Sequence, residues 1–123
     1  MECPFCHPEQ GREIIAESEL AFAIYDKFPV NRGHVLIIPK RHYADYFELT
    51  VQEQTACILL LNEVKEFISH VFSPNGFNIG INIGSAAGQT VSHVHIHLIP
   101  RYNDDVDDPR GGVRGVIPDK QKY

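Results

Sequence analysis

Three histidines at alternate positions, His93, His95 and His97, are the residues of this sequence best suited to carry chemistry. Aliphatic residues separate them, so a β-strand would place the three imidazoles on one face and Val94 and Ile96 on the other. A neutral imidazole near its pKa is a good nucleophile toward phosphorus and leaves readily when water attacks. The pattern therefore predicts nucleophilic catalysis, and His95, flanked on both sides, suits the role of nucleophile.

A catalytic zinc bound by all three histidines is the rival interpretation of this triplet. Same-face residues of a strand lie about 6.6 Å apart, so the outer imidazoles start about 13 Å apart, whereas zinc–ligand bonds are about 2 Å long. Two of the three imidazoles could share a metal, but this spacing disfavours a site that uses all three.

The loop before the triplet, Gly88-Gln89-Thr90, suits a phosphorylated ligand. Its backbone amides, side-chain amide and hydroxyl are the donors that stabilise an anionic, trigonal-bipyramidal phosphorus. Ser92 is the only serine or cysteine between this loop and the end of the triplet, and alternation along a strand points it to the opposite face. We therefore do not expect Ser92 to replace the histidine as nucleophile.

The N-terminal pair Cys3 and Cys6 has the Cys-x-x-Cys spacing, which in a reducing compartment suggests metal or redox chemistry before a structural disulfide. Two thiolates at this spacing suit tetrahedral zinc, but two more ligands are required. The candidates are His7, His42, His70 and His93. A pair of unliganded thiols is the alternative, and redox catalysis is disfavoured because no strand precedes the pair.

The composition favours one small domain that binds a small ligand. The chain has 123 residues, 43% of them hydrophobic, so we expect a single domain over 1–123 that needs no disulfide bridges. Its 16 acidic and 11 basic residues give a net charge of −5, which disfavours binding to a nucleic acid polymer. No apolar stretch long enough for a membrane helix and no signal-peptide pattern is present, so we expect a cytoplasmic protein without a membrane partner.

Turn residues divide the chain into expected strands and one helix. Segments rich in β-branched and aromatic residues predict strands at 12–17, 20–25, 34–38, 77–83 and 91–99. The capping-box spacing of Thr50-Val51-Gln52-Glu53 predicts a helix start, and apolar residues then recur at helical spacing, from Cys57 to Phe72. The segment 73–76 supplies the stop, and 103–123 is expected to be an extended tail.

The segment 88–99 resembles, at every position, the histidine triad family pattern His-φ-His-φ-His-φ-φ, in which φ is aliphatic. Segments 33–40 and 20–26 are similar to the central and the nucleotide-facing strands of that family, and the resemblance covers about residues 1–102. It points to the dinucleoside polyphosphate hydrolase-like branch. It implies an α+β fold in which each protomer has a five-stranded antiparallel sheet and one long helix, and in which two protomers form a homodimer.

The resemblance also assigns roles to site residues. It implies that His95 is the nucleophile, that His97 assists at the scissile phosphate and the leaving group, and that His34 supports them. The residues implied to hold the nucleotide contact the ribose (Asp26), the phosphates (Asn82, Gly88, Gln89 and Thr90) and the base (Phe22 and Phe5).

The same resemblance selects among the candidate metal ligands. It implies a structural zinc held by Cys3, Cys6, His42 and His93, with a zinc-binding N-terminus at 1–10 and no organic cofactor. Zinc binding would release His93 from catalysis and leave His95 and His97 as the working pair.

The function that these observations predict is a nucleotide hydrolase or transferase. It would cleave at the α-phosphate of a dinucleoside polyphosphate, such as diadenosine tetraphosphate, through a nucleotidyl-histidine intermediate. The alternatives are a nucleoside phosphoramidase that uses the same covalent route and a nucleotide-binding regulatory protein with slow turnover. In the tail, Arg110 and Arg114 would either clamp the polyphosphate or offset the nearby aspartates.

Overall fold

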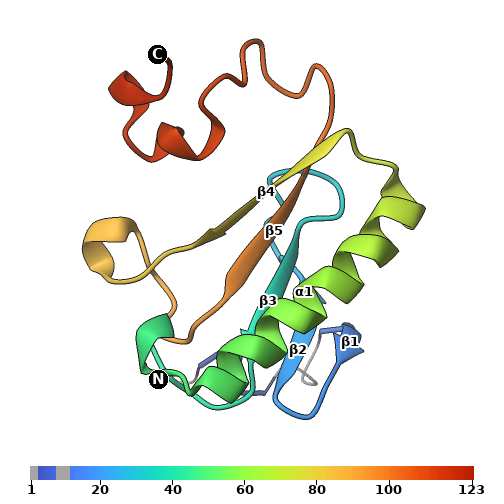
Figure 1. The fold of residues 1–123 in the computed structure, drawn as a ribbon, viewed down its shortest axis with the longest axis vertical. Coiled ribbons are helices and arrows are strands. Elements are labelled where there is room, and N and C mark those ends of the chain that lie inside the picture. The colour runs from blue at the N-terminus through green and yellow to red at the C-terminus, as the bar shows by residue number, and fades with distance from the viewer. Residues whose placement is uncertain (1–2, 8–11) are drawn as a thin grey trace.

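A five-stranded antiparallel sheet is covered on one face by a single long helix (Figure 1). A computed structural model describes residues 3–7 and 12–123, so residues 1–2 and 8–10 of the expected zinc-binding segment lie outside the described residues. The helix is α1 (Val51–Phe72), and the strands across the sheet are β1 (Ile14–Glu17), β2 (Ala21–Tyr25), β3 (Val35–Pro39), β5 (Ile96–Arg101) and β4 (Gly76–Ile81). This architecture confirms the predicted α+β fold.

The central strands are apolar on both faces because both faces of the sheet are covered. Alternate residues of β2 and β3 pack beneath α1, and the residues between them form a second cluster with Phe5 on the opposite face. On β5, Ile96 and Leu98 belong to the cluster beneath α1. His97, which lies between them, therefore faces the side of the sheet away from the helix.

The helix begins and ends where the sequence predicts. The Thr50 hydroxyl accepts a hydrogen bond from Glu53 N at 3.1 Å, and the Glu53 carboxylate accepts one from Thr50 N at 2.9 Å, which completes the capping box. The helix ends at Phe72, because Ser73 adopts the left-handed conformation with φ 50°. Cys57 is buried in the core, as expected.

The strand that carries the histidines starts later than predicted. The sequence predicts strand over 91–99, but β5 spans Ile96–Arg101. The pairing of β3 with β5 ends at Ile37 and Ile96, near Pro39, which has no backbone N–H to donate. Val94 N instead donates to Tyr43 O at 2.7 Å, so His93 and His95 lie on a loop that leaves the sheet.

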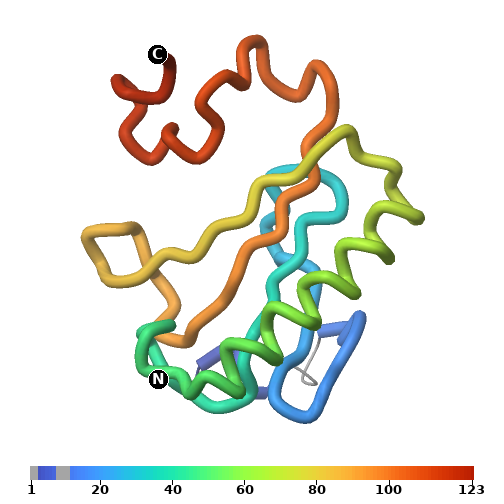
Figure 2. The backbone as a smooth tube through the Cα atoms, viewed as in Figure 1, coloured from blue at the N-terminus to red at the C-terminus, as the bar shows by residue number. Residues whose placement is uncertain are grey.

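The C-terminal tail is not extended, which corrects the prediction for 103–123. It forms two short 3₁₀ helices, η3 (Gly112–Val116) and η4 (Pro118–Lys120), and η3 packs against β4 (Figure 2). Gly111 has φ 91°, and a Cβ there would lie 1.8 Å from Gln121 O, so only glycine fits. Such short turns leave no apolar periodicity for a sequence pattern to detect.

Two further 3₁₀ turns, η1 (Tyr46–Glu48) and η2 (Ser85–Ala87), lie in the loops before α1 and after β4. Along the described residues, no helix has both the length and the apolar content needed to cross a membrane.

Candidate functional site

The ring of His95 is held through one of its nitrogens, and its other nitrogen has no hydrogen-bond partner among residues 3–7 and 12–123. His95 is 9% exposed, and its Nδ1 lies 2.8 Å from the backbone carbonyl oxygen of His93. A carbonyl only accepts hydrogen bonds, so the neutral ring carries its proton on Nδ1. The lone pair is therefore on Nε2, which is the protonation state that a nucleophilic histidine requires.

His97 is oriented by the buried side chain of His34. His34 Nδ1 accepts a hydrogen bond from Val30 N at 3.1 Å, which places the proton of the neutral His34 ring on Nε2. That Nε2 lies 2.9 Å from His97 Nδ1 and 3.4 Å from Asp26 Oδ2. His97 Nδ1 consequently accepts a hydrogen bond, and the proton of the His97 ring is on Nε2.

Burial keeps these two imidazoles uncharged. Burial and the proximity of His95 and His34 lower the pKa of His97 to about 4, although the Asp26 carboxylate opposes this shift. Burial likewise lowers the pKa of His34, again against the effect of Asp26. At neutral pH His97 is therefore a neutral hydrogen-bond donor at Nε2.

A cavity of about 530 Å³ lies on this face of the sheet and contains most of the predicted site. Eight of the predicted residues line it: Phe5, Asp26, His34, Asn82, Gly88, Thr90, His95 and His97. Its volume is within the range of small-ligand pockets. We refer to it as the nucleotide cavity because the sequence predicts that its residues hold a nucleotide. Phe5, which is 5% exposed, packs edge-on against His95 with ring centroids 5.0 Å apart.

Two predicted ligand residues, Phe22 and Gln89, do not line this cavity. Phe22 is 3% exposed and packs in the cluster that contains Phe5. The Gln89 side chain accepts from Gly84 N at 2.8 Å and donates to Ala44 O at 2.9 Å, so its amide fixes the loop. Phe22 thus packs in the cluster that holds Phe5, and Gln89 holds the loop that carries Gly88 and Thr90.

Sequence reasoning missed two basic residues of the nucleotide cavity, Arg12 and Lys27. Arg12 Nη1 donates to Tyr25 O at 3.3 Å, which holds it at the end of β2. Both side chains carry positive charge into a cavity that is predicted to hold phosphates. Lys27 directly follows the predicted ligand Asp26, and this adjacency is the only sequence signal that pointed to it.

The structure brings Cys3, Cys6, His42 and His93 together, so that their ligand atoms all lie within 4.8 Å of one another. The His93 Nε2–H donates to Pro39 O at 2.8 Å, which turns Nδ1 toward Cys3 Sγ at 3.3 Å and Cys6 Sγ at 3.6 Å. His42 Nδ1 lies 3.2 Å from Cys6 Sγ. Two thiols and two imidazole nitrogens that converge in this way fit a tetrahedral zinc site.

Burial and the neighbouring Cys3 thiol raise the pKa of Cys6 to about 11. A bound cation would favour the thiolates. His93 connects the cysteine cluster with His95. Its ring lies beside Cys3 Sγ, and its backbone carbonyl accepts a hydrogen bond from His95 Nδ1.

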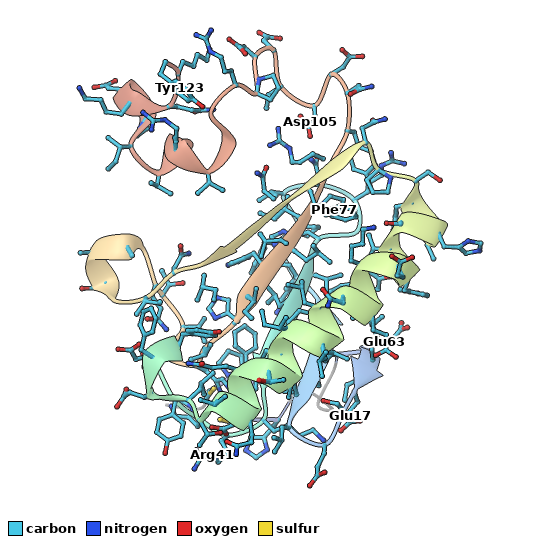
Figure 3. The ribbon with its side chains drawn as sticks, in the orientation of Figure 1. Glu17, Arg41, Glu63, Phe77, Asp105 and Tyr123 are labelled. Atoms are coloured by element: carbon cyan, nitrogen blue, oxygen red, sulfur yellow. The ribbon has the colours of Figure 1, made fainter. Side chains whose placement is uncertain are left out.

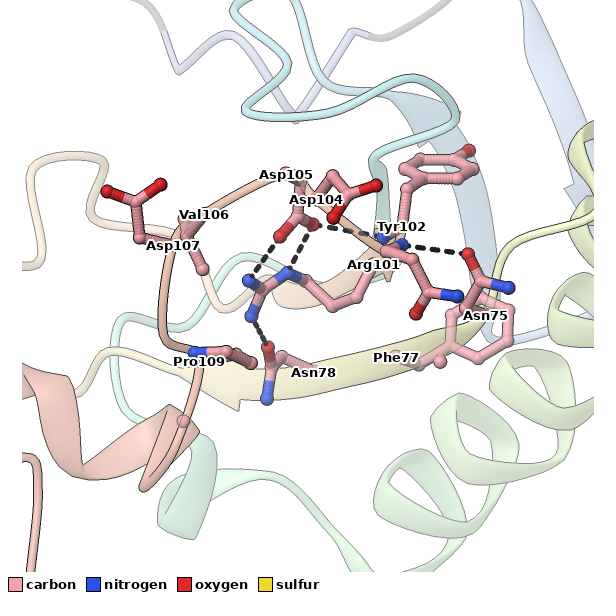
Figure 4. A pocket seen from close by; sticks show the side chains of 13 residues that line it. Asn75, Phe77, Asn78, Arg101, Tyr102, Asp104, Asp105, Val106, Asp107 and Pro109 are labelled. Atoms are coloured by element: carbon pink, nitrogen blue, oxygen red, sulfur yellow. Dashed lines mark hydrogen bonds and ion pairs between the residues drawn. The ribbon is translucent and has the colours of Figure 1, made fainter.

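A larger cavity of about 700 Å³ lies at the other end of the sheet, around Arg101 (Figure 4). The Arg101 guanidinium donates to both oxygens of Asp105 at 2.8 Å and to Asn78 Oδ1 at 2.6 Å, so its charge is already paired. No histidine of the described residues lines this larger cavity. Figure 3 places Asp105 and Tyr123 at the end of the molecule opposite Arg41.

The tail arginine Arg114 is also engaged within the tail itself. It donates to Lys120 O at 2.8 Å and to Gln121 O at 3.3 Å, and its guanidinium lies 4.6 Å from the centre of the Tyr123 ring. Neither Arg110 nor Arg114 lines the nucleotide cavity.

Fold and site together define a small α+β protein in which a histidine of the sheet, His97, and one of the preceding loop, His95, line one cavity on the side away from the helix. The chain belongs to the HIT domain family, whose model matches residues 7–104.

The relatives with named activities include a phosphorylase and a tetraphosphatase. An AP-4-A phosphorylase from Mycobacterium tuberculosis is 31% identical over 107 residues, which cover 86% of this chain and 54% of that protein. A bis(5'-nucleosyl)-tetraphosphatase (asymmetrical) from Schizosaccharomyces pombe is 39% identical over 98 residues, which cover 80% of this chain and 54% of that protein. The chain thus spans about half the length of these two relatives.

Solved structures share the fold. A HIT family protein from Bacillus anthracis is 38% identical with a TM-score of 0.78, over 87% of this chain and 79% of that chain. A Zn-bound histidine triad family protein from Mycobacterium smegmatis is 35% identical with a TM-score of 0.75, over 85% of this chain and 78% of that chain.

Proposed function

We propose that the protein is a nucleotide hydrolase or transferase that cleaves at the α-phosphate of a dinucleoside polyphosphate, such as diadenosine tetraphosphate. The observation that carries this proposal is the bond between His95 Nδ1 and the His93 carbonyl, which leaves His95 Nε2 as a nucleophile inside the nucleotide cavity. The names of the phosphorylase and the tetraphosphatase relatives support the substrate class.

The reaction proceeds in two displacements at phosphorus. In the first, His95 Nε2 forms a bond to the α-phosphorus while the bond to the bridging oxygen breaks. That oxygen departs as an anion on the leaving nucleotide and accepts a hydrogen bond from His97 Nε2–H. In the second, water attacks the phosphorus, the phosphorus–nitrogen bond breaks, and one proton is released to solvent.

The groups around the nucleotide cavity serve charge stabilisation and positioning. Thr90 offers a hydroxyl, while Arg12 and Lys27 supply positive charge for the phosphates. The Gly88 backbone amide donates to Ser85 O at 3.0 Å, so Gly88 shapes the loop around the cavity. Asp26 serves the ribose hydroxyls, and Phe5 packs against the base. His34 acts through His97 by holding its tautomer.

The test is to replace His95 with Asn and compare it with His70→Gln, which removes an exposed imidazole near the end of α1. We expect His95→Asn to lower turnover of diadenosine tetraphosphate by several orders of magnitude while nucleotide binding remains, because the phosphate-holding groups are intact. Intact-mass measurement of the wild type after an acid-free quench should show a nucleoside monophosphate adduct. Near-normal turnover by His95→Asn would refute the mechanism.

The cluster of Cys3, Cys6, His42 and His93 is proposed to hold a structural zinc. The convergence of the four ligand atoms and the Zn-bound relative from Mycobacterium smegmatis support this. Bound zinc would supply the charge that keeps both thiols ionised. Bound zinc would tie the N-terminal turn of Cys3 and Cys6 to the loop that carries His93.

A homodimer is proposed from the outer surface of α1. Five large apolar side chains of the helix remain 44–72% exposed: Val51, Ile58, Leu59, Phe67 and Val71. Exposed apolar side chains of this kind favour burial against a second copy of the chain. Light scattering should give about twice the 13.9 kDa chain mass, and a monomer at micromolar concentration would contradict the proposal.

A further inference from the structure

A second cavity, of about 440 Å³, adjoins the nucleotide cavity and has mostly aliphatic walls. The two cavities share four lining residues, Val30, His34, Asn82 and His97. We refer to the second one as the aliphatic cavity. Its volume lies within the range of about 300–1,000 Å³ that small-ligand pockets occupy, and its position beside His97 connects it to the proposed chemistry.

One wall of the aliphatic cavity is the sheet, and the other is the tail. Gly80 and Asn78 of β4 pair with His97 and Ile99 of β5, so these four residues share the face away from α1. A Cβ added to Gly80 would meet no atom within 4 Å, so the space above this strand is open. Opposite lie residues of η3 whose side chains are poorly covered, Val113 at 60% and Val116 at 77% exposure.

The order of residues from the loop at His95 into β5 gives the direction in which a leaving group departs. His95 lines the nucleotide cavity, His97 lines both cavities, and Ile99 lines the aliphatic cavity. Within the strand, two residues advance the chain by about 6.6 Å. Displacement at phosphorus is roughly in line, so the leaving group departs on the side opposite the attacking nitrogen. A group that leaves from above His97 would therefore extend toward Ile99.

We propose that the aliphatic cavity binds the leaving nucleoside of a dinucleoside polyphosphate, with its base between Ile99 on the sheet and Val113 and Val116 on the tail. Asn78 and Asn82 line the cavity and offer polar groups to its edges, although Asn78 Oδ1 already accepts from Arg101, so Asn78 has only its Nδ2 hydrogens to donate. This inference rests on the proposed function, and it makes the tail a part of the substrate site. Binding here favours substrates with a second nucleoside over those with a small leaving group.

The decisive variant is Gly80→Val, which places a side chain in the open space of the aliphatic cavity. Its backbone φ is not in the left-handed region and its Cβ meets no protein atom, so we expect the variant to fold normally. We expect kcat/KM for diadenosine tetraphosphate to fall about tenfold. For adenosine phosphoramidate, whose leaving group is ammonia, kcat/KM should stay within about twofold of the wild type.

Matched controls come from the same strand and the same tail. Gly76→Val adds a side chain to β4, again with no atom within 4 Å, but Gly76 lies outside the aliphatic cavity. On the tail, Val116→Ser should reproduce the selective loss, whereas Ile117→Ser, at a residue of 59% exposure that does not line the cavity, should not. An equal loss for both substrates, or the same selectivity in all four variants, would overturn the proposal.

A binding measurement separates this inference from the proposed chemistry. In the His95→Asn background, Gly80→Val should weaken diadenosine tetraphosphate binding about tenfold and leave AMP binding unchanged. Unchanged binding of both ligands would overturn the subsite. A selective binding loss in a protein whose wild type cleaves neither substrate would support the subsite and refute the proposed catalytic function.

Discussion

Replacing Glu53 with Gln tests the contact that joins the start of α1 to the loop that carries His42. The Glu53 carboxylate accepts hydrogen bonds from Arg41 Nε at 2.6 Å and Nη2 at 2.9 Å, and from Thr50 N at 2.9 Å. Its side chain is 4% exposed. The variant keeps the size of the side chain and one acceptor oxygen but removes the charge that pairs with Arg41.

The expected loss follows from the pKa of Glu53. Hydrogen bonds from Arg41 lower this pKa from 4.5 to about 2, against the effect of burial. At 1.36 kcal/mol per pKa unit the shift corresponds to at most about 3.4 kcal/mol. The Arg41 side chain is 53% exposed, so solvent screens the pair, and Gln still accepts from Thr50; we expect about 1.5 kcal/mol. The melting temperature should fall by roughly 5 °C.

The loss should depend on pH in a defined direction. The folded-state pKa is lower than the unfolded-state pKa, so ionised Glu53 stabilises the fold fully above about pH 4.5, and this contribution disappears as the pH falls toward 2. The difference in free energy of unfolding between wild type and Glu53→Gln should therefore shrink to less than half between pH 7 and pH 3. Urea denaturation at both pH values measures this difference.

The matched control is Glu66→Gln on the same helix, whose carboxylate is 79% exposed and lies 3.4 Å from Lys65 Nζ. We expect it to change stability by less than about 0.5 kcal/mol. The reasoning is wrong if the two variants lose the same stability at pH 7, or if the Glu53→Gln difference is equally large at pH 3.

Three further predictions concern the metal cluster, the tail and the leaving group. Cys3→Ser should lower the bound zinc from about one equivalent per chain and reduce thermal stability with it; metal analysis and melting curves check this, and a metal-free wild type of the same stability would contradict it. Gly111→Ala should release the tail, because its Cβ would lie 1.8 Å from Gln121 O at φ 91°; proteolysis within 107–123 should become faster, and unchanged protection would count against the role of this glycine. His97→Asn should lower turnover of diadenosine tetraphosphate about a hundredfold, and less for an adenylate with a better leaving group; an equal loss for both in steady-state assays would remove the leaving-group role.

The sequence predicted the elements whose patterns repeat. The residues of β2 and β3 alternate between two buried clusters, and those of α1 that face the sheet recur at helical spacing. Burial therefore leaves a periodic apolar pattern that can be read from the sequence. The Thr50 capping box involves residues close in sequence, so it too could be predicted. The start of β5 could not be predicted, because it depends on the hydrogen bond from Val94 N to Tyr43 O, which joins segments far apart in the chain.

The structure brings the predicted site residues together most completely where the chemistry of a residue limits its use. Histidines and cysteines have few alternative roles. The nucleotide cavity is lined by His34, His95 and His97, and the cluster of Cys3 and Cys6 contains His42 and His93. Phe22 and Gln89 have many alternative roles, and the structure uses them for packing and loop bracing. Arg12 was missed because only the folded end of β2 brings it to the cavity.

The hydrogen bond that fixes the His95 tautomer ends on a main-chain carbonyl, and every amino acid at position 93 would supply one. Substitution at 93 therefore cannot delete this acceptor and can only displace it. A descendant of this chain that lost both thiols would keep the nucleophile in its active tautomer, provided that another side chain held residue 93 against Pro39. The metal cluster and the nucleophile can thus diverge separately in evolution, although a single residue connects them here.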